Sequence, residues 1–170
     1  EATMESLGNY VQGLKDADDA LGELAEYVKT RDRNTVLIWF GDHLPTLGTN
    51  RAAYVQSGMI SQPESASDSL ALRHTPFLIY ANFPLKESTI VQKGAENLIS
   101  DYHLLGAACE MIGAPGTRLT AFLQRYAAVQ PYYCAAVSRA VNADETVLQF
   151  AEQHRLLTYD RLFGKQYSAN

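Results

Sequence analysis

The sequence has only two cysteines and one tryptophan among its 170 residues, and it lacks long apolar runs and basic stripes. Two thiols, Cys109 and Cys134, are too few to define a disulfide framework, so whether they pair stays open. The longest apolar run is far shorter than the roughly 20 residues of a membrane-spanning helix, and no signal peptide is visible. A net charge of -5 without a basic patch argues against nucleic acid as a partner.

The rest of the composition is that of an ordinary globular protein. Hydrophobic residues make up 46% of the chain and charged residues 19%. A chain of this length can bury the core of one domain. We therefore expect the chain by itself to be soluble.

Two short apolar stretches, residues 36–40 and 76–81, are rich in β-branched and aromatic types and predict strands. Neither alternates apolar with polar residues, which is typical of strands buried on both faces of a parallel sheet. Apolar residues at three- and four-residue steps over 10–28 predict an amphipathic helix, and 100–112 has the start and stop signals of another. The pattern predicts an α/β fold with a mainly parallel sheet flanked by helices, in which the two strands are parallel neighbours.

The other segments predict shorter or irregular structure. Residues 47–69 are rich in Gly, Ser, Thr and Asn, which predicts an irregular excursion with a short helix at 51–57. Residues 90–93 predict a short edge strand. Residues 117–128 predict a helix, and 147–154 a shorter one.

Asp42 and His43 follow the first predicted strand, after Gly41. Ligands of open α/β sheets bind at the carboxyl ends of strands, and a carboxylate beside an imidazole is half of a divalent metal site. The alternative is a strand terminus at which the aspartate caps the following turn and the histidine is solvated. Two ligands alone do not decide between these interpretations.

No other residue carries an equally strong signal. His74 precedes the second predicted strand, at the end opposite to the expected site, and is assigned to the surface or to a loop. His103 and His154 have no acidic or thiol neighbour at ligand spacing and are assigned structural roles, and Cys109 is expected to be a buried small hydrophobe. No Gly-x-Ser-x-Gly motif is present, so the chain offers no nucleophile signature.

The segments 9–14, 18–21, 75–82 and 159–165, together with Phe40-Gly41-Asp42-His43-Leu44-Pro45, resemble the lipoteichoic acid synthase-like sulfatases of the alkaline phosphatase superfamily. They keep the family's order across nearly the whole chain, which makes the signal more specific than Gly-Asp-His alone. The resemblance implies that residues 1–170 are the carboxyl-terminal portion of a sulfatase-like catalytic domain.

The resemblance also implies a function. Such enzymes are membrane-anchored and extracytoplasmic, and they transfer or hydrolyse phosphoglycerol or related esters with a threonine nucleophile and a divalent metal, often manganese. Asp42 and His43 fall on two of the metal ligands, whereas the nucleophile and a glutamate ligand belong to an upstream part of the same polypeptide. We therefore expect an active parent enzyme and an inert fragment. The alternative is a non-catalytic binding or structural module, and self-association through an exposed sheet edge stays open.

Overall fold

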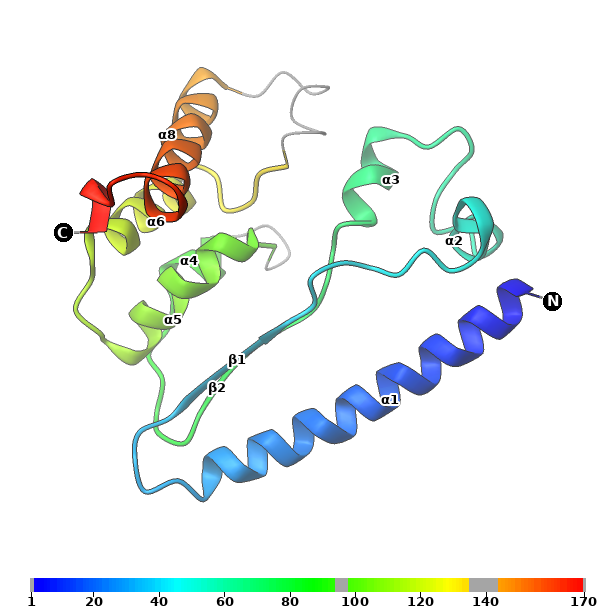
Figure 1. Cartoon of the computed structure of the whole chain (residues 1–170), viewed down its shortest axis with the longest axis horizontal. Coiled ribbons are helices and arrows are strands. Elements are labelled where there is room, and N and C mark those ends of the chain that lie inside the picture. Colours follow the sequence, from blue (N-terminus) through cyan, green and yellow to red (C-terminus); the bar gives the residue numbers. More distant parts are fainter. Residues whose placement is uncertain (1, 94–97, 135–143, 170) are drawn as a thin grey trace. The chain divides into compact units, whose positions relative to one another are not determined.

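The computed structural model describes residues 2–93, 98–134 and 144–169. The chain forms two compact units, Glu1–Pro84 and Leu85–Asn170. The first unit holds α1 (Ala2–Lys29), β1 (Val36–Phe40), η1 (Thr49–Arg51), α2 (Ala52–Gln56), α3 (Ala66–Ala71) and β2 (Phe77–Ala81) (Figure 1). The second unit holds α4 (Thr89–Lys93), η3 (Asp101–His103), α5 (Leu104–Ile112), α6 (Arg118–Val129), α8 (Glu145–Leu162) and η4 (Tyr167–Ala169).

The two predicted strands form and pair with each other, but they are antiparallel, with Val36 opposite Ala81 and Phe40 opposite Phe77. The prediction of parallel neighbours is therefore wrong, and no mainly parallel sheet is present in the described residues. The segment between the strands leaves the end of β1 and returns to that same end, where the amide of Gly41 donates to the carbonyl of Pro76 at 3.1 Å. A parallel pair needs a crossover that carries the chain back to the start of the first strand, and the short helices α2 and α3 do not form one.

The sheet is half-buried and not buried on both faces as predicted. Phe40 and Leu78 are exposed, and the other strand residues are of intermediate exposure. The predicted helix of residues 10–28 is confirmed as part of the longer α1, which contacts both strands and α2. Val28 near its end is buried, whereas Leu14 and Leu24 on the predicted apolar face are exposed.

The segment between the two strands, residues 41–76, contains a cluster of buried core residues of the first unit. Leu47, Tyr54 and Ile60 are buried together, and the Tyr54 hydroxyl donates to the carbonyl of Pro45 at 2.7 Å. The predicted short helix is confirmed as α2, and α3 is an additional helix that begins with a capping box between Ser65 and Asp68.

In the second unit, residues 90–93 belong to helix α4 and not to the predicted strand. The reason is a cap supplied from another helix. The Glu110 carboxylate accepts from the Thr89 amide at 2.8 Å and from the Ser88 hydroxyl at 3.0 Å. These bonds satisfy groups at a helix N-terminus that would otherwise lack partners.

The remaining helices of the second unit surround a core of Phe122, Leu123 and Tyr126 on α6. The predicted helix of residues 117–128 is confirmed as α6, with Thr117 and Thr120 forming its capping box. The predicted helix at 100–112 begins as the 3-10 helix η3 and continues as α5, and α8 extends the predicted 147–154 helix to Leu162. Packing of residues 100–112 on the sheet would join the two units and stays a prediction.

Candidate metal-binding pair

Gly41 places Asp42 and His43 beyond the end of β1. A Cβ atom at position 41 would lie 2.9 Å from the Cβ of Thr75, closer than such atoms approach in proteins. The Thr75 hydroxyl also donates to the Gly41 carbonyl at 2.7 Å. The glycine is therefore needed for close packing against Thr75, and not for a left-handed turn, because its φ lies outside that region.

The side chains of Asp42 and His43 lie close to each other. Oδ2 of Asp42 lies 3.5 Å from Nε2 of His43, and the two side chains are 83% and 77% exposed. The other carboxylate oxygen, Oδ1, accepts the backbone N–H of His43 at 2.8 Å. One oxygen thus fixes the carboxylate, while the other faces the imidazole.

The imidazole of His43 is oriented by its second nitrogen. Nδ1 lies 3.2 Å from the carbonyl oxygen of Leu44. In the neutral tautomer in which Nδ1 carries the hydrogen, Nδ1 donates to this carbonyl and Nε2 keeps the lone pair that a metal needs. Metal-binding histidines are commonly oriented by this kind of outer hydrogen bond.

The donor types therefore fit a divalent transition metal, but their number does not complete a site. No group of three or more His, Cys, Asp or Glu side chains that could hold a metal occurs among residues 2–93, 98–134 and 144–169. A zinc or manganese centre needs further ligands. The pair is thus a partial ligand set exposed at a strand end.

The other histidines occupy the places expected from the sequence. His74 is exposed in the loop before β2. His103 is fully buried among aromatic rings, its centroid 4.6 Å from that of Tyr102 and 5.3 Å from that of Tyr126. Burial lowers the pKa of His103 to about 4 and also lowers the pKa of His154, which favours neutral structural side chains.

The two cysteines are free thiols of intermediate exposure, so Cys109 is less buried than expected. Sequence reasoning also missed a pocket in the second unit that includes Arg118, Phe122 and Arg125. Their spacing of four and three residues along α6 was the available signal, since it places all three on one side of a helix.

Comparison with known protein families assigns the chain to one of them. The model of the family described as Sulfatase matches residues 1–113, which include Asp42 and His43. The chain belongs to the sulfatase family, of the alkaline phosphatase-superfamily type.

A curated relative from Rhizobium meliloti (strain 1021) is named as a cyclic beta-1,2-glucan modification protein. It is 30% identical to the chain over 179 aligned residues, and the alignment covers 99% of this chain. The chain spans only 27% of the relative's length. No solved structure matches the chain. None of the helices in the described part of the chain is long and apolar enough to cross a membrane.

Proposed function

We propose that this chain is the carboxyl-terminal portion of a metal-dependent enzyme of the cell envelope that transfers or hydrolyses phosphoglycerol or a related phosphate or sulfate ester. The observation that carries the proposal is the convergence of Asp42 Oδ2 and His43 Nε2 at an exposed strand end, inside the segment that matches the sulfatase family. The resemblance to lipoteichoic acid synthase-like enzymes supports the phosphoglycerol chemistry.

Asp42 and His43 act in this proposal as two ligands of one divalent cation, preferably manganese. A carboxylate with an imidazole suits manganese or zinc better than calcium, which prefers an all-oxygen shell. A metal bound there would polarise an ester oxygen and lower the pKa of an attacking hydroxyl. The nucleophile and the remaining ligands belong to an upstream part of the same polypeptide, which is the partner that this chain requires.

The name of the relative supports a glucan as acceptor. Over the whole proposed transfer, in which the upstream threonine carries the phosphoryl group between two displacements, a glucan hydroxyl oxygen ends bonded to phosphorus and the bond from phosphorus to the donor's alcohol oxygen is broken. The proton of the attacking hydroxyl ends on the released alcohol, so the reaction needs no oxidant or reductant. The membrane-anchored, extracytoplasmic setting follows from the same resemblance and belongs to the proposal.

A second candidate, a non-catalytic module with the sulfatase fold, is favoured by the incomplete ligand set among the described residues. One experiment separates the two. Asp42→Ala and His43→Ala are made in the intact protein, and manganese content and phosphoglycerol transfer to a glucan are measured. We expect both variants to lose metal-dependent turnover and to keep their fold, because both side chains are exposed and outside the core.

The matched control is His74→Ala, which removes an exposed imidazole near the other strand and should leave turnover unchanged. The 170-residue chain alone should show no turnover with or without manganese. Wild-type metal content and turnover in either pair variant would remove that residue from the site. An intact wild-type protein without any turnover would favour the non-catalytic module.

A further inference from the structure

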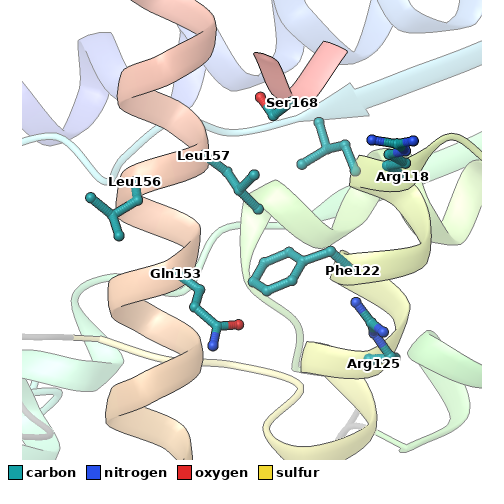
Figure 2. Close-up of a pocket in the computed structure, with 8 residues that line it drawn as sticks. Arg118, Phe122, Arg125, Gln153, Leu156, Leu157 and Ser168 are labelled. Atoms are coloured by element: carbon teal, nitrogen blue, oxygen red, sulfur yellow. The ribbon is translucent and has the colours of Figure 1, made fainter. Parts of the chain in front are cut away.

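A pocket of about 450 Å³ lies between α6, α8 and η4 of the second unit. Figure 2 shows Phe122 of α6 and Leu157 and Gln153 of α8 facing the same space, with Arg118 and Arg125 on the α6 side. Its size is that of a site for a small ligand or a lipid headgroup with part of its chain. All of its lining residues come after residue 113, so they lie outside the sulfatase match.

The charge of this pocket is positive. Arg118 and Arg125 are both exposed, and neither has an ion-pair partner among the described residues. No acidic residue lines the pocket, and α6 carries no Asp or Glu. Two uncompensated guanidinium groups beside an apolar floor favour an anionic partner with an apolar part.

The rim of the pocket continues into an apolar stripe on α8. Leu156 lines the pocket from the side of α8 away from Phe122 (Figure 2) and is 51% exposed. Tyr159 and Phe163 follow at steps of three and four residues, are 59% and 75% exposed, and have ring centroids 5.9 Å apart. Leu156 and Tyr159 share one face of α8, and Phe163, the residue directly after the helix, packs against Tyr159, so apolar side chains extend from Leu156 at the pocket to the end of α8.

We propose that the surface formed by Arg118, Arg125, Leu156, Tyr159 and Phe163 docks on an anionic lipid bilayer. The arginines would contact lipid headgroups, and the tyrosine, phenylalanine and leucine would enter the interfacial zone where amphipathic aromatic rings are favoured. A soluble anion would engage the arginines and leave the apolar stripe in water. A bilayer surface satisfies both features, and it does not involve the Asp42-His43 pair.

The test is co-sedimentation of the 170-residue chain with vesicles of phosphatidylcholine, with and without phosphatidylserine. We expect binding to the anionic vesicles only, weakened by salt. Arg118→Gln and Arg125→Gln should each lower the partition coefficient about fivefold, and Phe163→Ser should lower it with the charge unchanged. Arg33→Gln is the matched control, because it removes the same charge from an exposed loop of the first unit and should leave binding unchanged.

Circular dichroism and sedimentation velocity accompany the binding measurement. Equal binding to neutral and anionic vesicles, or wild-type binding by the double arginine variant, would overturn the proposal. Absence of vesicle binding together with self-association lost in Phe163→Ser would assign the surface to a second copy of the chain. Phosphate or glycerol phosphate binding at the arginines without vesicle binding would assign it to a soluble anion.

Discussion

The hydroxyl of Thr75 donates a 2.7 Å hydrogen bond to the carbonyl of Gly41, joining the residue that follows β1 to the approach of β2. The amide of Gly41 in turn donates to the carbonyl of Pro76 at 3.1 Å. Asp42 is the residue directly after Gly41, so the position of the candidate metal-binding pair depends on the close packing of Gly41 against Thr75.

Gly41→Ala should destabilise the chain. The new Cβ would meet the Cβ of Thr75 at 2.9 Å, and relieving the overlap should cost about 1–3 kcal/mol of unfolding free energy, as overpacking does elsewhere. Thr75→Val is the matched variant, since it keeps the branched shape but loses the hydrogen bond, at about 1 kcal/mol. Urea unfolding followed by circular dichroism measures both, and a Gly41→Ala variant as stable as wild type would contradict the close packing.

Asn82 should stabilise the connection between α1 and β1. Its side-chain oxygen accepts the amide of Thr35 at 2.8 Å, and its Nδ2 donates to the carbonyls of Arg31 and Arg33 at 2.9 and 3.0 Å. Asn82→Ala should lower the unfolding free energy by about 1–3 kcal/mol, because it leaves these backbone groups without partners.

Asn82→Asp tests the direction of these bonds. It keeps the acceptor for Thr35 but replaces both donors by a carboxylate oxygen that faces two carbonyls. We expect it to be at least as destabilising as Asn82→Ala in the same unfolding assay near neutral pH. A smaller loss than for alanine would show that the two donor contacts contribute little.

Acid should destabilise the chain partly through His103. Burial among Tyr102, Tyr126 and His154 lowers its pKa to about 4, whereas an unfolded histidine titrates near its reference value of about 6.5. Between these values the unfolded state binds more protons, so stability falls as the pH drops from about 6.5 toward 4, by up to roughly 3 kcal/mol. The lowered pKa of His154 acts in the same direction.

The measurement is urea unfolding at several pH values for His103→Leu, with exposed His74→Leu as the control. His103→Leu should flatten the pH dependence in this window because it removes the buried ionisable ring. His74→Leu should keep the wild-type slope. Equal slopes in all three proteins would show that His103 does not titrate differently on folding.

The sequence was sufficient for features determined by neighbouring residues. The helix of residues 117–128 was predictable because its cap, Thr117 and Thr120, and its apolar spacing lie within a few residues of each other. Both strands were predictable from their composition. The end of β1 before Gly41 was predictable from local composition as well. Asp42 and His43 are neighbours in the sequence itself.

What only the tertiary structure decided depends on residues far apart in the chain. Strand direction is determined by where residues 41–75 return, through the bonds of Gly41 to Thr75 and Pro76. The segment Thr89–Lys93 has β-branched residues, but it is a helix because Glu110, 21 residues away, caps it. The pocket between α6 and α8 could not be predicted from the sequence, because it depends on how the two helices pack together. Local periodicity shows which face of a helix is apolar but not which residues that face contacts.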